Sequence, residues 1–235
     1  MARSSGNEER ERRVLDAAVE LFVHYGYDKT SVDDIAREAG VSKGTIYLHF
    51  QSKEDLLEGV IVREMERFVD KWLKLVEEDP EGGTIGGMYR NSLHALFSSP
   101  FTAAMYQRSG RVLGNYLRKP DNLFRTFREE HEQSERYVFV KAMQEAGGVR
   151  QDVDPKVVAH IMDMLAYGLI GRDEFLSGQD MPPIEDVIEG IADLMDRALT
   201  PERGGNSEAG KDILFWIVAA SREQLHEQTK NPAQE

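Results

Sequence analysis

The sequence predicts an all-α protein: an N-terminal three-helix head with a helix-turn-helix, followed by a larger helical body. The first observation is an apolar stripe at helical spacing near the N-terminus. It consists of Val14, Leu15, Ala18, Leu21, Phe22 and Tyr25. The second is the position of the prolines, which fall between periodic stretches rather than inside them. Helices are therefore expected at about 10–25, 31–38, 42–48, 52–78, 86–98, 101–118, 121–146, 155–177, 184–199 and 208–229.

Composition narrows the class of protein. The chain has 235 residues and no cysteine, which excludes disulfides, thiolate catalysis and cysteine zinc sites. It contains no apolar run long enough to cross a bilayer, and its first residues lack the apolar core of a secretory signal. We therefore expect a cytoplasmic protein with no membrane partner. The net charge of −13 argues against non-specific coating of nucleic acid, but a sequence-specific binder needs only a local basic face.

The segment 30–57 carries the pattern of a helix-turn-helix. Ala36 is small where the second helix crosses the first, and Gly40 permits the left-handed conformation that the turn needs. Ser42 is expected to cap the second helix, whose free amides make a positive end. The apolar side chains expected to close the core between the two helices are Ile35, Val41 and Ile46.

The run TSVDDIAREAGVSKGTIYLHFQSKEDLL resembles the DNA-binding head of the tetracycline-repressor (TetR/AcrR-type) family of transcriptional regulators. The resemblance covers about residues 10–57, and we expect a DNA-binding domain at 1–55 and an effector-binding and dimerisation domain at 56–235. It implies base contacts from Lys43 and Thr45, and close backbone approach at Gly44. It implies phosphate contacts from Tyr47, His49 and Lys53, and from Thr30 or Ser31 at the preceding helix start. Ser42, at the positive end of its helix, is also a candidate DNA-binding residue.

In that family the helical body binds a small-molecule effector and pairs with a second copy. Aromatic and Met side chains suit a hydrophobic pocket, and the candidate ligand-binding residues are Trp72, Tyr89, Phe97, Met105, Tyr106, Tyr116, Phe127 and Tyr137. The stretches 156–170 and 184–199 are apolar on more than one side, which predicts a homodimer interface. Its candidate residues are Ile161, Leu165, Gly168, Ile188, Ile191 and Met195.

These features predict a ligand-responsive repressor that binds a near-palindromic operator as a dimer and is released by a hydrophobic or aromatic effector. One alternative is a DNA-binding regulator or activator that needs no ligand. Another is a helical metal-binding or hydrolytic enzyme, for which the pairs His131/Glu135 and His160/Asp163 are candidates. No catalytic set is readable, and no cofactor or metal is expected. The apolar run 213–218 must dock, either on a partner or on the chain's own body.

Overall fold

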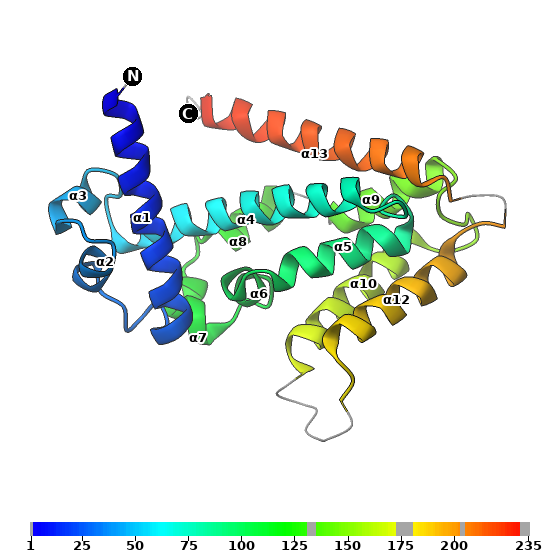
Figure 1. The fold of residues 1–235 in the computed structure, drawn as a ribbon, viewed down its shortest axis with the longest axis horizontal. Helices are drawn as coiled ribbons and strands as arrows, with labels where there is room; N and C mark the ends of the chain where they lie inside the picture. The colour runs from blue at the N-terminus through cyan, green and yellow to red at the C-terminus, as the bar shows by residue number, and fades with distance from the viewer. Residues whose placement is uncertain (1, 131–134, 173–180, 203–204, 231–235) are drawn as a thin grey trace. The chain divides into compact units, whose positions relative to one another are not determined.

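The computed structural model describes residues 2–130, 135–172, 181–202 and 205–230 (Figure 1). These residues form helices joined by turns and contain no strand, which confirms the all-α prediction. The helices are α1 (Ala2–Tyr25), α2 (Val32–Glu38), α3 (Lys43–Tyr47), α4 (Lys53–Glu78), α5 (Ile85–Phe97), α6 (Pro100–Tyr106), α7 (Gly110–Leu113), the 3₁₀ helix η1 (Gly114–Arg118), α8 (Leu123–Glu130), α9 (Glu135–Glu145), α10 (Pro155–Ile170), α12 (Ile184–Leu199) and α13 (Ser207–Lys230).

The chain divides into two compact units. The first, here called the head unit, comprises Met1–Val69 and Leu96–Glu132. The second, here called the body unit, comprises Asp70–Ala95 and Gln133–Glu235. The helix-turn-helix therefore belongs to a unit that also contains α6, α7, η1 and α8.

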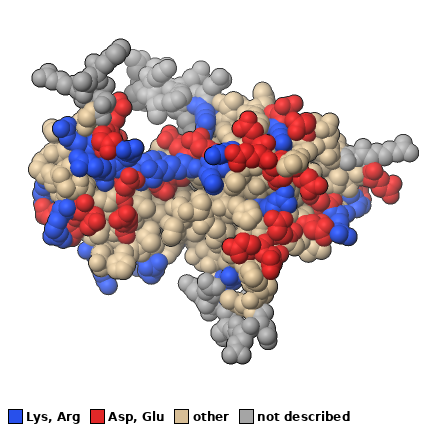
Figure 2. Space-filling view, viewed as in Figure 1, with Lys and Arg blue, Asp and Glu red and all other residues tan. Residues whose placement is uncertain are grey.

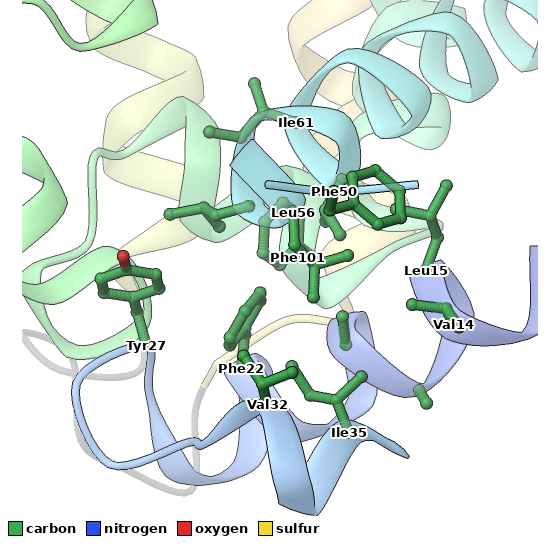
Figure 3. Packing of buried hydrophobic residues seen from close by; sticks show 14 of the residues in the cluster. Val14, Leu15, Phe22, Tyr27, Val32, Ile35, Phe50, Leu56, Ile61 and Phe101 are labelled. Atoms are coloured by element: carbon green, nitrogen blue, oxygen red, sulfur yellow. The ribbon is translucent and has the colours of Figure 1, made fainter. Parts of the chain in front are cut away.

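One apolar cluster holds the head unit together. Figure 3 shows Phe22 of α1, Ile35 of α2, Leu56 of α4 and Phe101 of α6 directed into the same interior. Ile35 and Ile46 are buried there as predicted, and Val41 packs against the cluster's edge. A short helix such as α3 is not stable alone, so this shared core is what fixes its position.

The single helix predicted over 101–118 is wrong. The segment forms α6, α7 and η1, because Arg108 and Gly114 adopt left-handed backbone conformations with φ of 52° and 54°. At Gly114 the chain turns onto Asp28, whose carboxylate oxygens accept the Asn115 amide at 3.1 and 3.2 Å. The first helix also starts earlier than predicted, at Ala2, while Gly26 ends it with φ of 84° as expected.

In the body unit, the glycine-rich turn before α5 receives the C-terminal helix. The Gly83 amide donates to Ser207 Oγ at 2.9 Å, and a Cβ on Gly210 would lie 1.9 Å from the Gly83 carbonyl oxygen. Helix α13 also packs on α9, and its Leu214 is buried. Leu214 thus docks the run 213–218 on its own body unit, whereas Trp216 of the same run is 71% exposed. Among the described residues, none of the helices is both long and apolar enough to cross a membrane.

Candidate nucleic-acid interface

A capping box holds the start of α2, the first helix of the helix-turn-helix. Ser31 caps α2: its Oγ accepts the Asp34 amide at 3.1 Å, while the Asp34 carboxylate accepts the Ser31 amide at 3.1 Å. The Ser31 hydroxyl, and then Arg37, lower the pKa of Asp34. Gly40 takes the predicted left-handed conformation in the turn, with φ of 64°. The capping box thus satisfies the first amides of α2, and Gly40 lets the chain turn toward α3.

Helix α3 begins at a serine cap and is anchored by one buried side chain. Ser42 Oγ accepts the Thr45 amide at 3.1 Å and lies 2.8 Å from Thr45 Oγ1. Ile46 is buried in the head-unit core, so the rotation of α3 about its axis is fixed. As a result Ser42, Lys43, Gly44 and Tyr47 are exposed, and Thr45 is half-buried.

The outward face of α3 carries an intramolecular ion pair. Lys43 Nζ lies 2.7 Å from Asp33 Oδ2 of α2, and both side chains are exposed. The hydrogen bond from Asp33 raises the pKa of Lys43. A phosphate or base that binds Lys43 must therefore compete with this carboxylate.

Three side chains predicted to contact DNA have partners inside the head unit. Thr30 is buried, and its Oγ1 donates to the Gly26 carbonyl at 2.9 Å. Lys53 Nζ donates to two carbonyls, of Tyr27 at 2.9 Å and of Thr30 at 3.0 Å, and lies over the Tyr27 ring. Burial lowers the pKa of Lys53.

The third is His49. Its side chain is only 9% exposed, and its Nδ1 lies 3.3 Å from Glu11 Oε2 of α1. The predicted phosphate contacts of Thr30, Lys53 and His49 thus remain predictions that require these side chains to exchange partners.

Leu48 is an exposed residue that sequence reasoning missed. It is 84% exposed, although it directly precedes the inward-turned His49. The sequence did carry a signal, because Leu48 follows Gly44 by four residues and Thr45 by three. Residues at these spacings share a helix face.

Charge over the head is mixed. The face drawn in Figure 2 shows a band of basic side chains across the head, with acidic side chains on both sides of the band. On α1, Arg12 pairs with Glu9, and on α2, Arg37 pairs with Asp34 at 2.5 Å. Sequence-specific contacts rather than bulk attraction would therefore have to supply most of the selectivity of this head.

A buried ion network links α1, α4 and the start of α6 within the head unit. Glu64 Oε1 accepts from Arg63 and from Arg67, each at 3.0 Å, and Ser99 Oγ donates to Glu64 Oε2 at 3.2 Å. The two guanidinium groups also reach Asp16 Oδ1, at 3.0 and 3.2 Å. The Glu64 side chain is only 4% exposed, so its charge depends on these partners.

Next to this network lies a partly open cavity of about 310 Å³. It is lined by Val19, Glu64, Arg67, Phe68, Ser98, Ser99, Pro100 and Thr102. None of the predicted effector-binding residues lines it.

The predicted effector-binding residues are distributed over both units. In the head unit, Met105 and Tyr116 are part of the buried cluster that also holds the helix-turn-helix, and Phe97 is half-buried. The Tyr116 hydroxyl donates to Glu58 at 3.0 Å and accepts the Leu123 amide at 2.8 Å. Burial raises the pKa of Tyr116. Tyr106 is half-buried. The side chain of Phe127 lies outside the described part of the structure.

In the body unit, Tyr89 is fully buried and donates to the Met162 carbonyl at 2.5 Å, and burial raises its pKa to about 12. Trp72 Nε1 donates to the Met88 carbonyl at 3.0 Å, and its ring packs edge-on against Phe139. Lys156 Nζ lies over the Tyr137 ring. These three aromatic residues are thus engaged in the body unit's own packing.

The predicted dimer residues differ in exposure. Ile161 and Gly168 are exposed on α10, Leu165 and Ile191 are half-buried, and Ile188 and Met195 are buried inside the body unit. Exposed apolar side chains continue along α10 at Val157 and Met164. Helix α10 therefore presents an apolar face to its surroundings.

The residue pairs considered for a metal give no site in the described ranges. His131 lies outside the described residues. His160 is exposed, and Asp163 pairs with Arg136 at 2.9 Å. No group of three or more metal-ligating side chains is assembled in the part of the chain that the structure describes.

Residues 14–60 match the family model described as bacterial regulatory proteins, tetR family. The fatty acid metabolism regulator protein of Bacillus subtilis is 42% identical over 67 residues, which are 28% of this chain and 32% of that protein. Two further curated relatives match over 47% and 25% of their own lengths, so the likeness to these proteins covers well under two thirds of them.

Solved structures match over more of the chain. A putative TetR-family transcriptional regulator from Rhodococcus sp. has a TM-score of 0.58 and 25% identity, covering 82% of this chain and 100% of that one. The regulator FadR from Bacillus subtilis in complex with stearoyl-CoA has a TM-score of 0.55 and 20% identity, covering 78% and 96%. Fold and head together are similar to those of transcriptional regulators with a DNA-binding helix-turn-helix. Residues 14–60 therefore form a head of the tetR-family type, and the fold of the chain is similar to that of solved TetR-family regulators.

Proposed function

We propose that the protein is a ligand-responsive transcriptional repressor that binds a near-palindromic operator as a homodimer and leaves it when a small hydrophobic or aromatic effector binds. The observation that carries the proposal is the outward face of α3. Lys43 and Tyr47 are exposed and Thr45 is half-buried on a helix whose rotation is fixed by buried Ile46. A short helix with such an outward polar face suits the major groove.

The homodimer is supported by the apolar face of α10. Val157, Ile161 and Met164 are 54%, 46% and 58% exposed, at spacings of four and three residues. Gly168, seven residues after Ile161, continues the same stripe without a side chain. A two-fold axis would place this stripe against its own copy and remove it from water.

The effector class is supported by the relatives. One is a fatty acid metabolism regulator, and one structural neighbour is in complex with stearoyl-CoA. Long-chain acyl compounds are therefore the first candidates for this chain. An effector that prefers the released state by ~1–3 kcal/mol would lower operator affinity about 5- to 150-fold. The proposal assigns the chain no catalytic role, and DNA binding would place it in the cytoplasm.

The test begins with an operator selected from random duplexes by the full chain. Fluorescence anisotropy would then compare the unaltered protein with Thr45→Ala and with the matched Thr45→Ser. Thr45→Ala should weaken operator binding more than binding to a scrambled duplex, because it removes a base contact, whereas Thr45→Ser keeps the hydroxyl. Equal losses of affinity for both duplexes would show that Thr45 does not contact a base. Failure to select any sequence would refute the proposed function.

A second measurement adds stearoyl-CoA, with free coenzyme A as the control, to the protein–operator complex. Release by stearoyl-CoA alone supports the acyl class. If a wider panel of hydrophobic and aromatic compounds also leaves the complex intact, the alternative of a ligand-independent regulator or activator is favoured. Turnover of any added compound would favour the enzyme alternative.

A further inference from the structure

Leu48 stands out on the head because its neighbours in sequence turn inward. It is 84% exposed, whereas the His49 side chain is 9% exposed and Phe50 is buried in the core. The Leu48 amide donates to the carbonyls of Gly44 at 3.2 Å and Thr45 at 3.3 Å. Its backbone is therefore tied to α3, so the direction of its side chain is set by that helix.

Leu48 shares a helix face with the residues predicted to meet base edges. It follows Gly44 by four positions and Thr45 by three, and side chains at these spacings are neighbours. Gly44 contributes no side chain, so nothing from that position screens the leucine. Together with the Thr45 methyl group, Leu48 makes a small apolar surface at the end of the outward face of α3.

The major groove offers one apolar feature to such a surface. Guanine, cytosine and adenine present donors and acceptors there, which a leucine cannot satisfy, while thymine presents its 5-methyl group. We propose that Leu48 is a specificity-determining residue that packs on a thymine methyl group in each operator half-site. This assignment rests on the proposed function and extends it from the polar residues of α3 to an apolar one.

The test uses the operator selected from random duplexes and removes single methyl groups from it. Each thymine is replaced in turn by deoxyuridine, which lacks only the 5-methyl group. Dissociation constants are measured for the unaltered chain, Leu48→Ala, Leu48→Met and, as a control, Val62→Ala. Val62 is 45% exposed on α4 and has no predicted role in DNA binding.

At one thymine of each half-site, deoxyuridine should weaken operator binding by the unaltered chain about fourfold. That is the effect of losing the burial of one methyl-sized group. Leu48→Ala should bind the thymine operator more weakly and show no further loss with deoxyuridine at that position. Leu48→Met should keep most of the methyl sensitivity, and Val62→Ala all of it. Because Leu48 is exposed, its truncation should leave the melting temperature unchanged.

Two results would overturn the assignment while leaving the proposed function intact. Leu48→Ala with undiminished sensitivity at every thymine would assign the methyl contact to another residue. Weakened binding by Leu48→Ala, with no position sensitive to deoxyuridine, would place Leu48 on the sugar–phosphate backbone. A selection that yields no operator refutes the proposed function itself, and the assignment falls with it.

Discussion

Replacing Glu64 by glutamine would break the buried ion network of the head unit at its centre. Glu64 Oε1 accepts from both Arg63 and Arg67 at 3.0 Å, and the side chain is only 4% exposed. The Arg63 side chain is 14% exposed, and its buried Nε has no hydrogen-bond partner among the described residues. Glutamine keeps the shape and one acceptor, but it leaves the two guanidinium groups with Asp16 as their only carboxylate in this network.

Removing one member of a buried ion pair costs about 3–5 kcal/mol. We take the lower end, about 3 kcal/mol, because Arg67 is half-exposed and water can solvate it once the pair is broken. For a chain of this size, 1 kcal/mol corresponds to roughly 2–4 °C in melting temperature, so Glu64→Gln should melt roughly 6–12 °C lower.

The assay is thermal unfolding followed by circular dichroism, with urea unfolding as a second measure. Glu66→Gln is the matched control, because Glu66 is exposed on the same helix and loses the same charge. That control should change the free energy of unfolding by less than about 0.5 kcal/mol. Equal melting temperatures for the two variants would refute the argument that the Glu64 network stabilises the head unit.

Three other substitutions test separate features. Ile161→Asp should give folded monomers in sedimentation equilibrium, because Ile161 is exposed in the protomer. Ile188→Asp should unfold the protomer, because Ile188 is buried. A dimeric Ile161→Asp protein would contradict the proposed interface. Gly210→Ala should loosen α13 and increase binding of a hydrophobic dye, because its Cβ would overlap a carbonyl oxygen; unchanged dye binding and melting temperature contradict this. Asp33→Asn should tighten binding to a scrambled duplex at low salt, because it frees Lys43 of α3 from its ion pair. Glu20→Gln is the control, since it removes the same charge from an exposed site on α1. Equal effects of the two changes would mean that only net charge matters.

The parts of the head that sequence reasoning predicted are those fixed by short-range interactions. The caps at Ser31 and Ser42 each depend on a residue three positions further along, so their signals lie within one turn of chain. The left-handed turn at Gly40 is likewise encoded by a single residue type.

The parts that it missed depend on distant partners. His49 turns inward toward Glu11, and this leaves Leu48 as the outward residue. No local pattern encodes that pairing, because the two residues belong to different helices. The break of the 101–118 helix likewise accompanies the packing of Gly114 and Asn115 on Asp28, a contact between segments far apart in sequence.

The predicted effector-binding residues depend on long-range packing even more strongly. Aromatic and Met side chains suit both a ligand pocket and an ordinary core, and composition does not separate the two. The structure buries Met105 and Tyr116 in the core shared with the helix-turn-helix and gives Tyr89 a backbone acceptor. The cavity in the head unit is lined by polar, charged and apolar side chains, Val19 and Phe68 among them, and by none of the residues predicted to bind an effector.

The ratio of dissociation constants for a scrambled duplex and the selected operator measures whether the outward face of α3 reads DNA sequence. The full chain would be measured on both duplexes at one physiological salt concentration. Specific regulators bind their sites roughly 10³- to 10⁷-fold more tightly than other DNA, and we predict a ratio in that range that falls with Thr45→Ala. A ratio near one, with the same affinity for both duplexes, would contradict the claim that the outward face of α3 reads DNA sequence.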